Sequence, residues 1–321
     1  MLEEIKKLPK IELHLHLDGS VSLEVASKLT NIKIEELKDK MIVKDECKSL
    51  TEYLTKFPFP ISLMQTKENL ELIAYDLVNR LEKENIIYAE IRFAPICHTL
   101  EGLSLESVVE SVLKGLNKNK KVKTKLILCM KRETSKKDNL EVIKLAGKYL
   151  DKGVGGIDLA GDEIKYKLDN YKDLFLYAKL NKVPFTIHVG ETSSRDIKGA
   201  IKLGTKRFGH GVKIIENKEL IKLVKKNNIL LEICPTSNIQ TNVFDEYYNH
   251  PIYKLYKDKV NISINTDNMT ISNIDLNQEY LKLLNSFKLT IEDLKEININ
   301  SLNYAFITSE EKLELLEILK R

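Results

Sequence analysis

Two histidines and an aspartate alternate along one short segment near the N-terminus. His14, His16 and Asp18 are each separated by a single leucine. Alternate side chains of an extended strand point to the same face, so these three share a face and the leucines take the other. Two imidazoles two residues apart on a strand face can reach one metal ion, although a polar outward face would give the same alternation. The motif alone leaves both interpretations open.

Further metal-binding residue types follow apolar runs elsewhere in the chain. His188 ends the run at 184–187, His210 lies between two glycines, and Asp267 follows the run at 262–266. Three histidines and one aspartate form a ligand set that suits zinc, and a catalytic zinc keeps one position open for water. A single histidine at a strand end more often serves the structure. Several such residues on different strands favour a metal centre if the fold brings those strand ends together.

Short apolar or alternating segments recur between longer segments of helical periodicity. The predicted strands are 11–17, 86–93, 125–130, 156–160, 185–189, 207–209, 229–234 and 260–265. The predicted helices include 67–84, 105–117, 139–150 and 217–226, with further helical segments near 284–302 and 309–320 on the outside. Eight strands that alternate with helices predict βαβ units closing into a parallel barrel.

Polar side chains follow nearly every predicted strand. They are His14, His16, Asp18, Arg92, Lys131, Arg132, Asp162, Glu163, His188, Glu191, His210, Ser237, Asn238, Asp267 and Asn268. Barrel enzymes place their chemistry at these C-terminal strand ends, where eight loops converge. An open doubly wound sheet would need a glycine-rich phosphate turn, and G-x-G-x-x-G does not occur. We therefore expect an α/β fold, a (β/α)8 TIM-like barrel with extra peripheral helices, as a single catalytic domain over residues 1–321.

The composition indicates a soluble globular protein. The chain has 321 residues, 43% of them hydrophobic and 31% charged, and its 51 basic and 47 acidic residues are spread along its length. The net charge of +4 does not imply a nucleic-acid partner. Four dispersed cysteines, an N-terminus without an apolar core segment and the lack of a long apolar run predict a cytoplasmic protein without membrane contact. The oligomeric state stays open, and a monomer is compatible with the sequence.

Six short segments together resemble those of adenosine deaminases in the amidohydrolase superfamily. They are HLHLDGS (14–20), GIDLAGDE (156–163), HVGE (188–191), GHG (209–211), PTSN (235–238) and NTDN (265–268). They occur in the family's order and span nearly the whole chain, which makes the set far more specific than a lone H-x-H. The resemblance implies a zinc-dependent hydrolase of purine salvage that converts adenosine and 2′-deoxyadenosine to the inosines and ammonia. It also implies one zinc ion per chain.

The resemblance further implies roles for the residues of the reaction. The zinc ligands would be His14, His16, His188 and Asp267. Glu191 would donate a proton to purine N1, and His210 would be the base and electrostatic partner of the attacking water. Glu191 must then be protonated when substrate is bound, which burial under an aromatic ligand favours. The alternative for Glu191 is a salt bridge, for instance with Arg195.

Substrate contacts are implied in the same way. Gly161 would offer its backbone N–H to purine N3, although it could equally be a simple turn glycine. Asp18 would meet the ribose 5′-hydroxyl. Asn268 occupies the position where many family members have an aspartate that contacts purine N7, so this contact is the least defined.

The segment 50–57 carries one apolar stripe at helical spacing. Leu50, Tyr53, Leu54 and Phe57 stand at i, i+3, i+4 and i+7, which is ordinarily a core-packing face. In the resembling family the equivalent helix covers the nucleoside pocket as a hydrophobic lid. The prolines at 58 and 60 are expected to break the helix after it. Both interpretations of the stripe stay open.

Motifs typical of several other functions are absent from this sequence. A binuclear amidohydrolase would carry a bridging lysine at the end of the fourth strand, and deaminases with an H-x-E and P-C-x-x-C signature are not matched. Enzymes acting on adenine or aminofutalosine tend to read HLEGS where this chain has Asp18, and an Asp18 carboxylate would repel the 5′-phosphate of AMP. Methylthioadenosine stays open as a substrate. A non-catalytic, metal-stabilised nucleoside-binding barrel would be marked by loss of Glu191 or His210.

Overall fold

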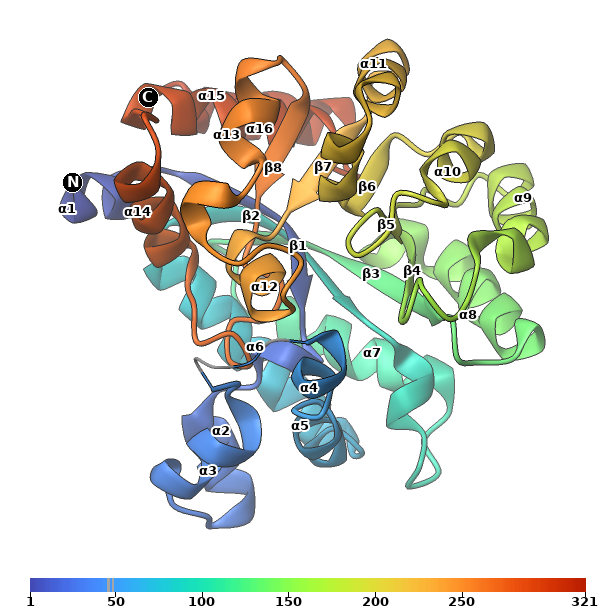
Figure 1. Cartoon of the computed structure of the whole chain (residues 1–321). Coiled ribbons are helices and arrows are strands. Elements are labelled where there is room, and N and C mark those ends of the chain that lie inside the picture. The colour runs from blue at the N-terminus through green and yellow to red at the C-terminus, as the bar shows by residue number, and fades with distance from the viewer. Residues whose placement is uncertain (45–46, 48) are drawn as a thin grey trace.

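A ring of parallel strands forms the centre of the computed structural model, which describes residues 1–44, 47 and 49–321 (Figure 1). Within this described part the strands are β1 (Lys10–His16), β2 (Ile86–Phe93), β3 (Lys123–Lys131), β4 (Val154–Ala160), β5 (Ile187–Val189), β6 (Arg207–His210), β7 (Leu230–Ile233) and β8 (Asn261–Ile264). They pair in chain order as two parallel ladders, β1 to β4 and β5 to β8. Each strand predicted from the sequence is present, with its ends shifted by a few residues.

Single bridges close the two ladders into a barrel. Ile157 of β4 pairs with Phe185 just before β5, and Leu15 of β1 pairs with Asp267 just after β8. At the second seam the main-chain N–H of His16 donates to the Asp267 carbonyl at 2.7 Å, and that of Asp267 donates to the His14 carbonyl at 2.9 Å. The expected (β/α)8 fold is therefore confirmed, and residues expected to bind metal form its closing seam.

Helices cover the outside of the barrel between consecutive strands (Figure 1). The main outer helices are α6 (Lys67–Lys83), α7 (Leu105–Leu116), α8 (Lys136–Tyr149), α9 (Lys172–Leu180), α10 (Ile197–Leu203), α11 (Lys218–Lys226), α13 (Ile252–Lys257), α14 (Leu276–Ser286) and α15 (Ile291–Asn303). The side chains of Thr66, Ser104 and Ser135 cap the first three by accepting backbone N–H groups. Local capping chemistry thus fixes where these helices begin.

Additional short helices extend the barrel, as the sequence predicted. They are α1 (Leu2–Lys7), α2 (Leu23–Thr30), α3 (Ile34–Met41), α4 (Leu50–Leu54), α5 (Pro58–Leu63), α12 (Pro235–Gln240) and α16 (Ser309–Leu319). Helices α2 to α5 all lie between β1 and β2, and α4 and α5 stand beside the barrel opening (Figure 1). This long insertion after the first strand supplies one wall of the site described below.

One helix prediction was wrong in detail. The segment 284–302 is not one helix: α14 ends at Ser286 and α15 starts at Ile291, because Thr290 and Asp293 form a reciprocal capping box there. The break expected at the prolines is present: α4 ends at Leu54, and Pro58 occupies the first turn of a new helix, α5, where a missing N–H costs no helical hydrogen bond.

Two further sequence expectations concern the thiols and membranes. Cys47, Cys97, Cys129 and Cys234 are all free thiols. Among the helices that the structure describes, none combines the length and apolar character needed to cross a membrane.

Candidate active site

The C-terminal ends of the strands surround a cavity of about 300 Å³. Every site residue predicted from the sequence lines this cavity except His14, which is fully buried. The lining residues that had been predicted are His16, Asp18, Tyr53, Leu54, Phe57, Gly161, His188, Glu191, His210, Asp267 and Asn268. The fold thus gathers side chains that are up to 250 residues apart in the sequence at one opening of the barrel.

Four of these side chains converge on one small volume. The Nε2 atoms of His16 and His188 lie 3.4 Å apart. Oδ1 of Asp267 lies 3.5 Å from Nε2 of His14 and 3.5 Å from Nε2 of His16. Atoms that share a tetrahedral zinc ion at about 2.0–2.1 Å stand roughly 3.3–3.4 Å apart, so this spacing fits a metal centre.

Two buried carboxylates hold the histidine rings in this orientation. Nδ1 of His14 lies 2.9 Å from Oε2 of Glu232, and Nδ1 of His188 lies 2.6 Å from Oδ2 of Asp158. A carboxylate at Nδ1 fixes that proton and leaves the Nε2 lone pair free for a metal. Nε2 of His14 is buried with no hydrogen-bond partner among the described residues. A bound metal ion would remove the cost of that unsatisfied atom.

One arginine links these two carboxylates. Fully buried Arg92 donates to Oδ2 of Asp158 and to Oε2 of Glu232, each at 2.7 Å. Arg207 donates to the other oxygen of Glu232 at 2.6 Å. Burial would raise the pKa of Glu232, but these two guanidinium groups outweigh it and hold that pKa well below its usual range. Asp158 and Glu232 were not predicted as site residues, because the sequence shows each of them only as an acidic residue inside an apolar strand.

The backbone of two site residues adopts an unusual conformation. His210 and Asp267 have φ angles of 60° and 61°, in the left-handed region that side chains disfavour. Gly209 precedes His210, and a Cβ atom there would stand 3.1 Å from Cε1 of His14 and 3.1 Å from Cα of His188. The dense packing around this position therefore favours glycine, because a larger residue would have to push His14 or His188 aside by a few tenths of an ångström.

A second acidic side chain holds the loop that carries Glu191. The carboxylate of Glu163 accepts hydrogen bonds from backbone N–H groups on both sides of Glu191. Those of Gly190 and Ser193 are each 2.9 Å away, and the Thr192 hydroxyl adds a bond at 3.0 Å. Because these hydrogen bonds hold the backbone on both sides of Glu191, they fix where its side chain enters the cavity.

The surroundings of Glu191 favour its neutral form. Burial raises the pKa of Glu191 well above its usual range, and the negative charges of Asp267 and Glu163 raise it further. Arg195, which could have paired with it, instead donates to the main-chain oxygen of Glu163. A carboxylic acid that stays protonated here can donate a proton to a bound ligand.

His210 faces both Glu191 and the metal-binding group. Its Nε2 lies 3.8 Å from Oε2 of Glu191 and 4.0 Å from Oδ2 of Asp267. Burial lowers the pKa of His210 well below its usual value, so the ring is neutral. The three side chains leave room between them for a small molecule such as water.

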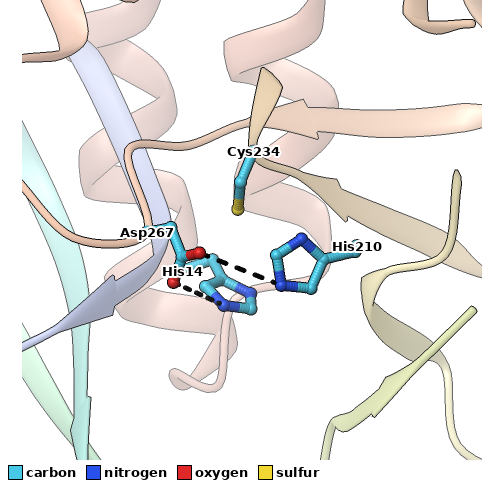
Figure 2. A group of neighbouring side chains, drawn as sticks. All are labelled: His14, His210, Cys234 and Asp267. Atoms are coloured by element: carbon cyan, nitrogen blue, oxygen red, sulfur yellow. Dashed lines mark ion pairs between the residues drawn. The ribbon is translucent and has the colours of Figure 1, made fainter. Parts of the chain in front are cut away.

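A cysteine also stands beside this group (Figure 2). The ligand atoms of His14, His210, Cys234 and Asp267 lie within 4.8 Å of one another, so this set could in principle hold an ion. However, the Cys234 thiol lies 3.6 Å from the Glu232 carbonyl, and burial raises its pKa well above the usual value. Atoms of the three histidines and Asp267 lie closer together, at 3.4–3.5 Å, so these four form the better set.

Asp18 and Gly161 also line the cavity, and Oδ1 of Asp18 lies 3.9 Å from Nδ1 of His16. Burial raises the pKa of Asp18 to about 6, although nearby Lys131 opposes this shift. Gly161 has a φ of 111°, and a Cβ atom there would stand 2.6 Å from the Glu133 carboxylate. The positive φ strains any side chain at position 161, and a Cβ atom would also require the Glu133 carboxylate to move. Gly161 therefore has a steric reason to be glycine that is independent of any ligand.

Asn268 packs against Gly19, in the turn that follows β1. A Cβ atom at position 19 would stand 1.8 Å from Oδ1 of Asn268, so Gly19 is needed for this approach. That Oδ1 is buried and has no donor among the described residues. The Asn268 side chain also lines the cavity.

Helix α4 closes the cavity from above the strand ends. Tyr53 is 2% exposed, and its hydroxyl lies 2.7 Å from Oγ of Ser272. Leu54 is 41% exposed, whereas Leu50 and Phe57 are half-buried. All four line the cavity. The apolar stripe therefore covers a pocket and does not pack into the barrel core, although nothing in its position alone requires movement.

The chain is similar to known proteins in both sequence and fold. A family model described as adenosine deaminase matches residues 9–321. An adenosine deaminase of Clostridium perfringens is 40% identical over 323 residues, which cover 96% of this chain and 97% of that protein. The N6-methyl-AMP deaminase of Arabidopsis thaliana superposes with a TM-score of 0.89 at 28% identity, covering 100% of this chain and 98% of that one. Arabidopsis ADAL in complex with IMP gives 0.89 at 27%, covering 99% and 98%.

Proposed function

The chain belongs to the adenosine deaminase family, and from that premise we propose how its residues carry out the hydrolytic deamination of adenosine. The enzyme converts adenosine and water to inosine and ammonia. 2′-Deoxyadenosine is proposed as a second substrate, because none of the residues assigned here would contact the 2′-hydroxyl. The observation that carries the proposal is the position of His210 in one buried cavity, with its Nε2 3.8 Å from Oε2 of Glu191 and 4.0 Å from Oδ2 of Asp267.

A single zinc ion would be held by His14, His16, His188 and Asp267. The matching spacing of their atoms and the unsatisfied Nε2 of His14 support this set. When bound, zinc supplies Lewis-acid chemistry, lowering the pKa of a water molecule to about 7. The chain's own part is to hold the histidine rings, as Glu232 does for His14 and Asp158 does for His188.

Glu191 would act on purine N1, and His210 would act on the water that attacks purine C6. Attack of water oxygen at purine C6 pushes an electron pair onto N1, and a proton from the neutral Glu191 carboxyl can balance that charge. Both protons of the attacking water are then used: one restores the Glu191 carboxyl, and the other goes to the 6-amino nitrogen, so that the C6–N bond breaks and ammonia leaves. His210 would contact the attacking oxygen through Nε2. Glu163 keeps Glu191 in place throughout, because its bonds to the loop do not involve the reacting atoms.

The sugar and the purine edge would be held by three further groups. Asp18 would accept a hydrogen bond from the ribose 5′-hydroxyl, and the Gly161 N–H would donate to purine N3. Purine N7 is only an acceptor, so its partner must donate, and the Asn268 amide nitrogen can do so at any pH. Leu54 and its neighbours on α4 would cover the apolar faces of the base.

The cellular compartment, the domain organisation and the partners of the protein are proposed on separate observations. Four free thiols suit the reducing cytoplasm. The strand seams leave one continuous barrel, which supports a single domain over the chain. The partners would be a purine nucleoside and water, without nucleic acid.

Substrate comparison tests the proposal. We expect the purified zinc-loaded protein to release ammonia from adenosine and 2′-deoxyadenosine with far higher kcat/KM than from adenine, methylthioadenosine, aminofutalosine or AMP. Asp18 and Glu133 near the sugar end would repel a 5′-phosphate, with Lys131 already 3.8 Å from Glu133. A preference for AMP, the class suggested by the plant neighbours, would contradict the assignment of Asp18. Nucleoside binding without ammonia release would indicate a non-catalytic barrel.

A further inference from the structure

The side of His210 that faces away from the cavity contacts a buried row of polar groups. Nδ1 of His210 lies 3.1 Å from Nδ2 of Asn238. Oδ1 of the same amide lies 3.2 Å from Nε2 of His250, and Nδ1 of His250 lies 3.2 Å from the main-chain N–H of Ile252. All three side chains are at most 3% exposed. We call this row, from Ile252 through His250 and Asn238 to His210, the His210 relay.

The direction of the hydrogen bonds in the His210 relay is set at its far end. A backbone N–H can only donate, so Nδ1 of His250 must accept from Ile252. Burial lowers the pKa of His250 to about 3, which leaves that ring neutral with a single N–H. The proton of His250 is then on Nε2, and it donates to the Asn238 oxygen. The amide orientation follows from these partners, and Nδ2 is left to face His210.

The last bond of the relay decides the tautomer of the catalytic imidazole. An amide nitrogen donates and never accepts, so Nδ1 of His210 must offer a lone pair. We propose that the His210 relay keeps His210 as its Nε2–H tautomer, so that it presents a donor to the cavity, with Asn238 and His250 as positioning residues. The tautomer itself is independent of the proposed function, and only its effect on catalysis rests on that function.

The reverse arrangement would leave two donors facing each other. If Nδ1 of His210 carried the proton, the Asn238 amide would have to turn its oxygen toward His210. Nδ2 would then donate to His250, whose proton would move to Nδ1 and point at the Ile252 N–H. A buried donor facing another donor costs on the order of 1–3 kcal/mol, enough to make the reverse state a minor one.

This tautomer separates the two roles that the family resemblance gives to His210. Nε2 already carries a proton, so it has no lone pair with which to take another from water. It can instead donate a hydrogen bond to the attacking oxygen, while Oδ2 of Asp267, 4.0 Å from the same nitrogen, accepts from that water. His210 therefore stabilises the negative charge on the nucleophile and is not its base.

Nitrogen NMR of the zinc-loaded protein tests the tautomer directly. With ¹⁵N-labelled histidine, a long-range ¹H–¹⁵N spectrum distinguishes the protonated from the bare ring nitrogen, and a His210→Gln sample assigns the signals. We expect His210 and His250 both to carry their proton on Nε2. A proton on Nδ1 of His210, or on both nitrogens, would overturn the inference whether or not the protein deaminates adenosine.

Substitution of Asn238 tests the effect of the relay on catalysis. Asn238→Asp keeps the size of the side chain but offers only acceptors, so it should draw a proton to Nδ1 of His210 and move the NMR signals accordingly. Loss of one preorganised donor typically lowers kcat about 10²–10³-fold, and KM should change little because no purine contact is lost. Unchanged kcat with a reversed tautomer would show that the Nε2–H donor is not used.

Asn298→Asp is the matched control for that variant. Asn298 is equally buried but lies on α15, where it accepts from the Ile11 N–H at 2.8 Å. The same buried charge is placed there without touching the His210 relay. We expect the His210 signals to keep their wild-type positions in Asn298→Asp. A tautomer change in both variants would mean that a general loss of packing, not the relay, moves the proton.

Discussion

The two sides of the cavity are built on different principles. Beneath it lies what we call the floor, made of His14, His188, Asp158, Glu232 and Arg92. Above it lies the cover, made of Leu50, Tyr53, Leu54 and Phe57 on and after α4. In the floor, the carboxylates of Asp158 and Glu232 lie 2.6–2.9 Å from the imidazoles and the Arg92 guanidinium, and all of these side chains except His188 are fully buried. In the cover, a side chain such as Leu54 is 41% exposed, and the described polar contact is that of Tyr53 with Ser272.

The difference shows that one region of the site fixes the reacting atoms, whereas the other shapes the pocket around the nucleoside. Directional bonds between buried charges allow little displacement, because each partner left unpaired costs several kcal/mol. Apolar contacts lack direction and weaken gradually with distance. The floor can therefore fix atoms for the reaction, while the cover can adapt to the shape of the bound nucleoside. Substitutions in the two regions should consequently differ both in size and in the kinetic parameter that they change.

The largest effect is expected at Glu191, between the two regions. Glu191→Gln keeps the volume of the side chain but cannot cycle a proton to N1. General acid catalysis typically contributes 10²–10⁴-fold, so kcat should fall to the upper end of that range or beyond, with zinc content unchanged. Measured kcat above a tenth of wild type would place the acid elsewhere. In the wild type, activity should be lost as pH rises through the raised pKa of Glu191, because the ionised form cannot donate.

Breaking the floor should weaken both metal binding and stability. Glu232→Gln removes the charge that pairs with Arg92 and Arg207 and that orients His14. Loss of such a partner typically lowers metal affinity 10–100-fold, and an unpaired buried charge costs about 3–5 kcal/mol of unfolding free energy. Zinc competition and thermal unfolding measure the two effects.

Glu90→Gln separates these two consequences of breaking the floor. Glu90 pairs with Arg207 at 2.6 Å, as Glu232 does, but the described contacts of Glu90 include no histidine. This variant should lose stability and keep its zinc affinity. If both variants lose zinc equally, the orientation of His14 does not depend on Glu232.

A smaller, pH-dependent effect is expected at Asn268. In Asn268→Asp the new carboxyl donates to N7 only while it is protonated. Below its pKa the variant should approach wild-type kcat/KM, and above it the ionised group would face the N7 lone pair, so kcat/KM should fall as pH rises. Parallel pH profiles for the two proteins would mean that Asn268 does not donate to N7 and instead orients Asp267.

The smallest effect is expected in the cover. Leu54→Ala removes an apolar contact from a side chain that is already 41% exposed. KM for adenosine should rise only a few-fold with kcat unchanged, the pattern of lost uniform binding. Leu100→Ala, at a site 79% exposed and outside the cavity lining, is the control and should change neither parameter. A large fall in kcat for Leu54→Ala would mean that the cover also positions the reacting atoms.

Only some residues of the floor could be predicted from the sequence. His14 and His188 could be predicted because histidine is rare and because strand ends of a barrel must converge. Asp158 and Glu232 could not, because a single acid inside an apolar strand does not reveal its partner. Arg92 meets Glu232 across 140 positions of sequence, and only closure of the barrel creates that pair. The partners of His210 were hidden for the same reason.

The cover and the outer helices show a different limit. Leu50 to Phe57 has helical spacing, yet that spacing could not decide between packing into the core and covering a pocket, since both need the same apolar stripe. The helix predicted over 284–302 failed because Thr290 was not recognised as a cap. Apolar periodicity continues across such a break, whereas local hydrogen bonds of Thr290 and Asp293 end it.

Zinc titration of the metal-free protein tests the central claim most directly. The protein is stripped of metal by chelation, and adenosine deamination is measured as zinc is returned. If the floor holds one zinc ion for Glu191 and His210 to work beside, the rate should rise from near zero in proportion to bound zinc and level off at one ion per chain. Full activity in the metal-free protein, or a rate that keeps rising beyond one bound ion, would contradict the account.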